Sequence, residues 1–377
     1  MRLGVDAWGL SGSLAHTGMG QYALHLLAGI PEHAPDIDLN AYGGPSEPRP
    51  ATLPASIRWE TPGARGPRKL QALTSRMLAL RRAAQRDRLD LFHTPGVHVR
   101  PSLPPVASVD CPLVVTVHDL IPLTFYGSAM PLRLRIFYRW NLRRALAAQR
   151  VITVSEAART EIAPRAPGAK ITVIPNGVDR PSLTAGPRPA AAGGCGHYIL
   201  YAGSYEPRKN LMRAFDAYAL LAARGDAPDL VAIVDANSGH EQEARWHLAQ
   251  AGVGERVRLV SGVSDEELWK LYAGADVLFF PSLAEGFGLP PLQAAACGVP
   301  VVASDLPAVR ETMQDAALFV PARDAIAMAA ALETALRDET LRARLIAAGY
   351  ERAGAHTWNR SAEQHVALYR EIAGQRS

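Results

Sequence analysis

The sequence predicts an α/β protein with two doubly wound domains, each a parallel sheet covered by helices. The chain has 377 residues, 48% of them hydrophobic, which is too long for one ordinary core and suits two domains of roughly 180 residues. Short β-branched runs alternate with helical patterns in both halves, as expected for parallel strands joined by crossover helices. Between the halves, residues 180–197 are rich in Pro, Gly and Ala and predict a linker.

The first domain is expected to span residues 1–182. Its helical patterns cover 68–86 and 131–148, and a glycine-containing stretch, HTGMGQYA (16–23), leads into another helix. Its expected strands are RLGVDA (2–7), IDLNAYGG (37–44), LDLFHT (89–94), PLVVTVHD (112–119), RVITVS (150–155) and KITVIPN (170–176).

The second domain is expected to span residues 195–357. Ser264 and Glu267 form a capping-box pattern that marks one helix start, and the chain beyond 324 is helical to its end. Two such domains facing each other predict a ligand cleft where the carboxyl ends of their strands meet. The expected strands are HYILYAG (197–203), DLVAIVD (229–235), RVRLVSG (256–262), DVLFFP (276–281), VPVVAS (299–304) and AALFVP (316–321).

Charge is unevenly distributed along the chain. The net charge is only +4, yet residues 61–150 hold fifteen Lys and Arg against four Asp and Glu. The segments 81–88 and 133–144 mix Arg with apolar or aromatic residues, which suits an anionic membrane surface, although solvated helix faces would look the same. No helix-turn-helix, zinc-finger or RNA-recognition signature accompanies the charge, so nucleic acid is not expected as a partner.

The sequence predicts a cytoplasmic protein, with peripheral attachment to the inner face of the membrane left open. No apolar run of 18 or more residues is present, and the start MRLGVDAW resembles a strand rather than a secretory signal. The cysteines Cys111, Cys195 and Cys297 form no CxxC pair and are interpreted as small buried hydrophobes.

The stretch HTGMGQYA formally matches G-x-G-x-x-A, a pattern found in dinucleotide-binding loops. About ten residues separate it from the first strand, and no acid ends the strand 37–44, so NAD is excluded. Gly18 and its neighbours still predict a helix N-terminus that suits a phosphate, unless the glycines only shape a turn.

Two further stretches follow predicted strands. YAGSYEPRKNL (201–211) brings Ser204, Arg208 and Lys209 into one loop before a helix, where cations could neutralise a diphosphate or simply be solvated. VTVHDLIP (115–122) places His118 at a strand end, where a hydrogen-bonded structural histidine is the alternative to a functional one.

The loop AEGFG (284–288) carries the most specific pattern. Its two glycines give access to backbone amides, Pro290 suits the first helical turn, and Glu285 lies just before the helix. A carboxylate here could accept hydrogen bonds from sugar hydroxyls, or it could cap the helix.

These stretches, together with VITVSEAARTEI, VIPNGVD and TGMGQYA, resemble the retaining glycosyltransferases of family 4, which have the GT-B fold. The resemblance covers essentially the whole chain in order. It implies that the nucleotide-sugar donor binds mainly to the second domain and the acceptor to the first. It also implies that the last helix, 358–377, returns to the first domain.

Carried to this chain, the resemblance assigns Glu285 and His118 to the reacting hexose. Arg208 and Lys209 would hold the diphosphate, with Gly18 closing over it. Gly286 in the glutamate loop is a further expected contact. The backbone amides of Phe287, Gly288 and Leu289 would bind the sugar and phosphate, and the backbone around Val263 would contact the base. The family uses no catalytic metal, and no DxD-like signature stands in a plausible place, so no cofactor is expected.

Two positions depart from the family pattern. Ser204 stands where Arg often follows the glycine of the diphosphate loop. Gln293 replaces the second carboxylate of the E-x7-E signature, which holds the ribose, although its amide could still accept from a ribose hydroxyl.

VHDLIPL and EPRKN are similar to bacterial mannosyltransferases of surface-polysaccharide assembly, such as those making lipopolysaccharide. They imply GDP-mannose as donor and a glycan or lipid-linked glycan as acceptor. A nucleotide-sugar epimerase of the same fold and a non-catalytic sugar-nucleotide binder remain alternatives.

Overall fold

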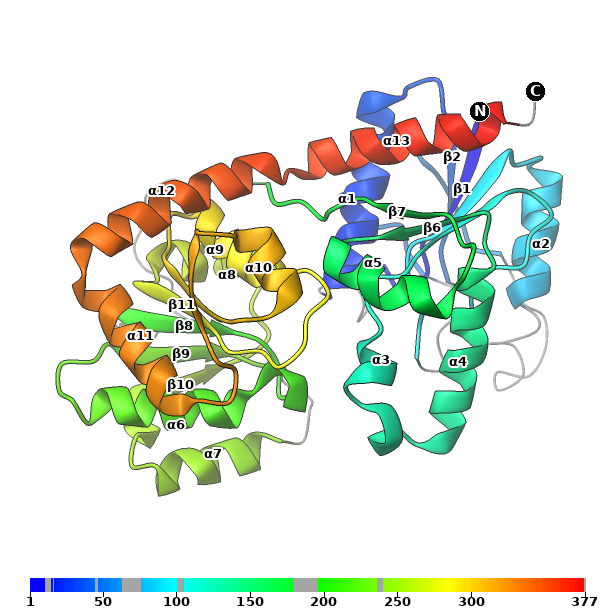
Figure 1. Cartoon of the computed structure of the whole chain (residues 1–377). Coiled ribbons are helices and arrows are strands. Elements are labelled where there is room, and N and C mark those ends of the chain that lie inside the picture. The colour runs from blue at the N-terminus through cyan, green and yellow to red at the C-terminus, as the bar shows by residue number, and fades with distance from the viewer. Residues whose placement is uncertain are drawn as a thin grey trace. The chain divides into compact units, whose positions relative to one another are not determined.

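The computed structural model describes residues 1–10, 15, 17–44, 47–62, 76–99, 105–179, 196–235 and 240–375. The chain divides into two compact units, residues 1–177 with 357–377, and residues 178–356 (Figure 1). Most of the predicted linker, Cys195 and the first part of the helical pattern 68–86 lie outside the described residues.

The first unit is built on a seven-stranded parallel sheet in the order β3-β2-β1-β4-β5-β6-β7. From β1 the strand order runs outward to β2 and β3 on one side and to β4 and later strands on the other, so the boundary between β1 and β4 is the topological switch point of a doubly wound sheet. The strands are β1 (Arg2–Asp6), β2 (Asp38–Tyr42), β3 (Arg58–Glu60), β4 (Leu91–Thr94), β5 (Leu113–Thr116), β6 (Arg150–Thr153) and β7 (Ile171–Val173). The α-helices are α1 (Gly18–His33), α2 (Arg76–Arg86), α3 (Ile121–Thr124), α4 (Leu132–Leu146), α5 (Glu156–Ile162) and α13 (Trp358–Gly374).

The second unit has a six-stranded parallel sheet in the order β10-β9-β8-β11-β12-β13, with its switch point between β8 and β11. Its strands are β8 (Tyr198–Ala202), β9 (Asp229–Ile233), β10 (Val257–Val260), β11 (Val277–Phe280), β12 (Val301–Ser304) and β13 (Ala317–Val320). Its α-helices are α6 (Leu211–Ala222), α7 (Glu241–Gln250), α8 (Asp265–Gly274), α9 (Leu289–Ala296), α10 (Pro307–Met313), α11 (Ala325–Arg337) and α12 (Glu339–Ala355).

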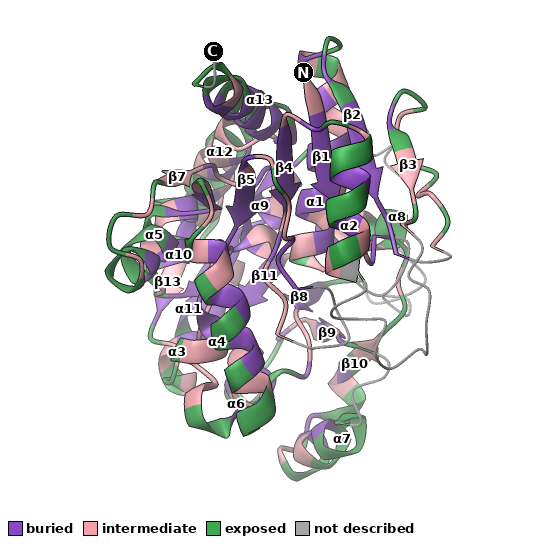
Figure 2. Ribbon diagram, turned by 90° about the vertical axis from the view of Figure 1, so that its right-hand side faces the viewer, coloured by how far each residue is buried: buried purple, intermediate pink, exposed green. Residues whose placement is uncertain are grey.

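The two doubly wound sheets confirm the predicted fold class. Central strands such as β8 and β11 are buried at every residue (Figure 2), which is why they are the continuous apolar runs YILYA and VLFF in the sequence. The predicted capping box is confirmed, because Ser264 and Glu267 exchange hydrogen bonds at the start of α8. Pattern analysis missed β3, a three-residue strand whose residues are exposed or half-buried.

Helix α13 packs against α1 within the first unit (Figure 1). The approach is close, since a Cβ added at Gly29 would lie only 2.6 Å from the Cβ of Ala362. A chain of buried polar side chains joins the same elements. The Tyr22 hydroxyl lies 2.7 Å from both Thr116 Oγ1 and His365 Nε2.

His93 extends this chain of contacts. Its Nε2 lies 2.8 Å from Thr116 Oγ1, and its Nδ1 lies 2.6 Å from the Tyr369 hydroxyl. All of these side chains are buried, so satisfied hydrogen bonds tie α13 to the middle of the first sheet.

Among the described residues, no helix is both long enough and apolar enough to cross a bilayer.

Candidate functional site

The second unit brings two predicted loops together at its switch point. β8 and β11 are neighbouring parallel strands, so the loops that follow them, 203–210 and 281–288, leave the same edge of the sheet. Direct bonds join the two loops. Leu283 N donates to Arg208 O at 2.6 Å, and Asn210 Nδ2 donates to Pro281 O at 2.9 Å. Ligands of doubly wound sheets bind at this kind of edge.

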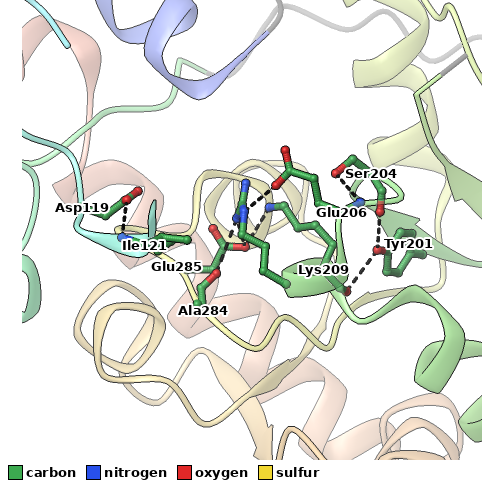
Figure 3. Close-up of polar contacts among 9 residues, drawn as sticks. Asp119, Ile121, Tyr201, Ser204, Glu206, Lys209, Ala284 and Glu285 are labelled. Atoms are coloured by element: carbon green, nitrogen blue, oxygen red, sulfur yellow. Dashed lines mark hydrogen bonds and ion pairs between the residues drawn. The ribbon is translucent and has the colours of Figure 1, made fainter. Parts of the chain in front are cut away.

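Glu285 forms a partly enclosed ion-pair cluster with the two predicted cations (Figure 3). Lys209 Nζ lies 2.7 Å and Arg208 Nη1 lies 3.2 Å from Glu285 Oε1. The side chains of Lys209 and Glu285 are only 12% and 10% exposed. This corrects the idea that Glu285 caps the next helix, because its carboxylate is held by the cations instead.

Burial and charge have opposite effects on Glu285. Burial raises the pKa of its carboxyl, but attraction by Lys209 and then Arg208 outweighs burial and leaves the pKa below its usual value. Burial also lowers the pKa of the Lys209 amine, against the attraction of Glu285. The two loops therefore place one carboxylate and two cations side by side. The cations can bind an anionic ligand group, and the carboxylate can accept hydrogen bonds from a ligand.

Tyr201, a buried residue of β8, supports the loop 203–210 through its hydroxyl (Figure 3). Its hydroxyl contacts the carbonyl oxygens of Ser204 and Lys209 at 3.3 and 3.1 Å. Burial and the nearby Glu285 carboxylate raise the pKa of its phenol, which keeps it protonated as a donor. Tyr201 was not singled out from the sequence, since within a strand it looks like an ordinary core residue.

Ser204, at the start of the first loop, uses its Oγ to accept from the backbone N of Glu206 at 3.3 Å. Glu206 in turn pairs with Arg208 Nε at 2.7 Å on the more exposed side of the loop. Arg208 therefore contacts an outer and an inner carboxylate.

Helix α9 begins at the end of the second loop, where a glycine adopts a left-handed backbone conformation. Its N-cap is Gly288, which has φ = 101° and no capping side chain. Phe287 is buried, and its carbonyl accepts from Thr312 Oγ1 at 2.9 Å, which anchors the turn. Gly286 precedes it, and Leu289 is the first helical residue. Two of the first three residues of α9 are prolines and carry no N–H, so the amides that can meet an anion here are those of Gly288 and Leu289, aided by the helix dipole.

Gln293 lies in the second turn of α9 and is half-buried. No described residue hydrogen-bonds its side-chain amide, which leaves donors and acceptor for a ligand. Val263 follows β10 near the carboxyl end of that strand and is half-buried too. Within the described part of the chain, no hydrogen bond joins either side chain to the ion-pair cluster.

His118 and Gly18 belong to the first unit. His118 follows β5 and donates from Nε2 to the carbonyl of Pro95 at 2.9 Å, and its ring meets that of Tyr22 edge-on with centroids 4.8 Å apart. Burial lowers its pKa to about 4, so the ring is neutral near pH 7 with Nδ1 as an acceptor. Gly18 is the first residue of α1, whose N-cap Thr17 accepts from Gly20 N at 3.1 Å.

A small pocket that the sequence did not single out lies at the switch point of the first sheet. Asp6 and Trp8 line it from the end of β1, and Thr94 and His98 line it from the end of β4. Thr94 is 3% exposed, and its Oγ1 has no hydrogen-bond partner among the described residues. A buried hydroxyl without a partner suits a polar ligand atom.

Comparison with known proteins gives the family. The model "Glycosyltransferase Family 4" matches residues 16–180, and "Glycosyl transferases group 1" matches residues 193–352. The MMP alpha-(1->4)-mannosyltransferase of Mycolicibacterium hassiacum is 30% identical over 361 residues, 89% of this chain and 84% of that protein.

The O-antigen chain mannosyltransferase B of Escherichia coli is 36% identical over 176 residues, 46% of this chain and 45% of that protein, so the match spans about half of it. A sucrose-phosphate synthase (tll1590) structure from Thermosynechococcus elongatus superposes with a TM-score of 0.80 at 20% identity, covering 100% of both chains, which supports the fold alone. Because two glycosyltransferase models match successive halves of the chain and a relative aligns along most of its length, this protein belongs to glycosyltransferase family 4 and has the GT-B fold.

Proposed function

We propose that this protein is a retaining, metal-independent hexosyltransferase that moves mannose from GDP-mannose to a glycan or lipid-linked glycan in polysaccharide biosynthesis. The observation that carries the proposal is the cluster of Arg208, Lys209 and Glu285 at the switch point of the second sheet. Family membership and the names of the relatives, which include an O-antigen chain mannosyltransferase, support the choice of sugar and pathway.

The donor-binding domain is proposed to be residues 195–357. Lys209 and Arg208 turn from Glu285 to the diphosphate and stabilise its charge as it leaves. The backbone amides of Phe287, Gly288 and Leu289, at the start of α9, add donors and the helix dipole. Glu285, released from the cations, accepts hydrogen bonds from hexose hydroxyls. Gln293 then contacts the ribose and the backbone near Val263 contacts the base.

The acceptor-binding domain is proposed to be residues 1–182 with 358–377. His118 presents a neutral Nδ1 acceptor, because Nε2 is committed to the Pro95 carbonyl, and this acceptor suits a sugar hydroxyl rather than a phosphate. The pocket of Asp6, Trp8 and Thr94 is our candidate for acceptor hydroxyls. Gly18 at the start of α1 would face the diphosphate.

Retention follows if the acceptor hydroxyl attacks on the face from which the diphosphate leaves. The breaking bond joins the anomeric carbon to the diphosphate oxygen, and the new bond joins that carbon to the acceptor oxygen. The departing phosphate oxygen, held by Lys209, is positioned to take the acceptor's proton. Chelator resistance and retained configuration are the two testable consequences.

The test is a donor panel read by nucleotide release, with and without candidate glycan acceptors. We expect GDP-mannose to give acceptor-dependent release that survives EDTA, and an α-linked product by NMR. Lys209→Ala should weaken nucleotide diphosphate binding by about tenfold or more, because a charge-assisted contact contributes roughly 1.5–3 kcal/mol. Release that ignores every acceptor, or an inverted product, would refute the proposal.

A further inference from the structure

Helix α4 carries an apolar row on the side that faces away from its own unit. Leu132, Ile136 and Trp140 are spaced four residues apart and are 61%, 59% and 38% exposed. The opposite side holds Phe137 and Leu142, which are buried in the core of the first unit. Figure 2 shows both exposed and buried colours along α4. The outward row is therefore additional to the face that the fold needs.

Arginines flank this apolar row. Arg133, Arg139 and Arg143 are exposed. At about 100° per residue, Arg133 and Arg139 project on either side of the Leu132–Ile136–Trp140 row, and Arg143 lies in line with it one turn further along the helix. The helix contains no Asp or Glu, and no described carboxylate pairs with these three side chains. The face thus combines exposed apolar groups with cations that have no counter-charge of their own.

Arg144, near the end of the same helix, has a different role. Arg144 Nη2 donates to the carbonyls of Val106 and Ala107, and its guanidinium lies 5.2 Å from the Trp140 ring centroid. This contact holds the indole at the edge of the helix. The tryptophan is therefore fixed in an outward position rather than free to fold onto the surface.

We propose that this surface, the α4 face (Leu132, Ile136 and Trp140 with Arg133, Arg139 and Arg143), docks on an anionic lipid bilayer with the helix lying in the membrane plane. The apolar row enters the headgroup boundary, the indole remains at the interface, and the arginines extend to lipid phosphates. The inference goes beyond the proposed transfer activity and is measured without it.

Charge argues for lipid over the other possible occupants. A second copy of this chain meeting the first through the same face would bring six exposed arginines together without any carboxylate, which is repulsive. The other large apolar side chains that are exposed in the described part of the chain each stand on a different helix and form no such row: Leu78, Leu220, Trp246, Ile326 and Tyr350. Trp246, 64% exposed, shares α7 with Glu241 and Glu243.

The position of α4 in the chain gives membrane docking a functional consequence. The segment 117–131 connects the end of β5 to α4, and it includes His118 and the short helix α3, which packs on α4. Docking through α4 therefore brings the segment that carries His118 to the lipid surface. A lipid-linked acceptor would be held in that surface, and this last step rests on the proposed function.

The experiment is flotation of the full chain with phosphatidylcholine vesicles, with or without phosphatidylglycerol, at low and high salt. We expect binding only to the anionic vesicles and its loss at high salt. Ile136→Asn should weaken vesicle binding about tenfold, because it removes an apolar side chain that becomes buried in the lipid when the helix docks. The matched control is Ile326→Asn, which changes a residue 66% exposed on α11 and should bind like the wild type.

A lipid-borne quencher gives a second readout. In a Trp246→Phe background, spin-labelled lipid should quench tryptophan emission, and Trp140→Phe should abolish most of that quenching. GDP binding should be equal in Ile136→Asn and the wild type, so failed docking and failed nucleotide recognition remain distinguishable. Equal flotation of Ile136→Asn and the wild type, or equal binding to neutral vesicles, would overturn the inference. So would self-association in solution that Ile136→Asn abolishes, or capture of an acidic protein in place of vesicles.

Discussion

Replacing Glu285 by Gln tests whether the carboxylate restrains the cations that bind the diphosphate. At the 2.7 Å between Lys209 Nζ and Glu285 Oε1, the attraction of two unit charges is about 6 kcal/mol at an effective dielectric of 20 and about 1.5 kcal/mol in water. Charge-assisted hydrogen bonds of roughly 1.5–3 kcal/mol fall in this range, against about 0.5–1.5 kcal/mol for a neutral amide. A diphosphate that recruits Lys209 must first weaken this contact.

Glu285→Gln should therefore tighten the binding of free GDP by about 1–1.5 kcal/mol, or five- to tenfold, while turnover of the sugar donor falls steeply. Calorimetry with GDP and initial rates with GDP-mannose measure the two effects. The matched control is Glu206→Gln. Glu206 also pairs with Arg208, but its side chain is 50% exposed, and the change should be small. GDP binding that weakens in Glu285→Gln as much as turnover falls would refute the reasoning.

Three further predictions concern His118, Gln293 and His365. Burial holds the pKa of His118 at about 4, so its ring stays neutral between pH 5.5 and 8. Over that range the pH–rate profile of His118→Asn should have the same shape as that of the wild type, although the variant should lower turnover more than GDP affinity. Gln293→Glu should tighten GDP binding by up to about 1 kcal/mol and lower KM. The value of kcat should be almost unchanged, because a ribose contact is nearly the same in the ground and transition states, and a large change in kcat would contradict this. Burial lowers the pKa of His365 to about 4, from an ordinary 6.5, so the folded chain stays unprotonated there while the unfolded chain binds a proton. Its contribution to stability is full above pH 6.5 and is lost as the pH falls toward 4, at about 1.4 kcal/mol per pH unit; urea titrations should give a shallower acid slope for His365→Gln, and an unchanged slope would contradict the assignment.

The sequence predicts the sheets well because buried parallel strands leave a strong local pattern. Strand β11 is the apolar run VLFF, and a capping box marks the start of helix α8. The edge strand β3 leaves no such pattern, because the three residues RWE are short, polar and partly exposed. Local signals thus report burial and capping, and they fade at the sheet edge.

The candidate site was only partly predictable. Lys209 and Glu285 could each be named from their own loops, but their ion pair joins residues 76 positions apart. It depends on β8 lying beside β11, and periodicity does not specify strand order. The hydrogen bond that fixes the His118 ring likewise depends on Pro95, at the end of another strand. Residue types and loops were predictable, whereas partners and charge states required the fold.

The first unit takes residues from both ends of the chain, and this sets the order in which the two halves can be completed during synthesis. The ribosome releases residues 1–177 first, yet their buried hydrogen-bond chain lacks His365 and Tyr369 until the last helix emerges. The second unit, 178–356, is continuous and has every element it needs earlier. The half made first is therefore the half finished last, and until then the face of α1 around Tyr22 lacks its cover and is exposed to chaperones and proteases.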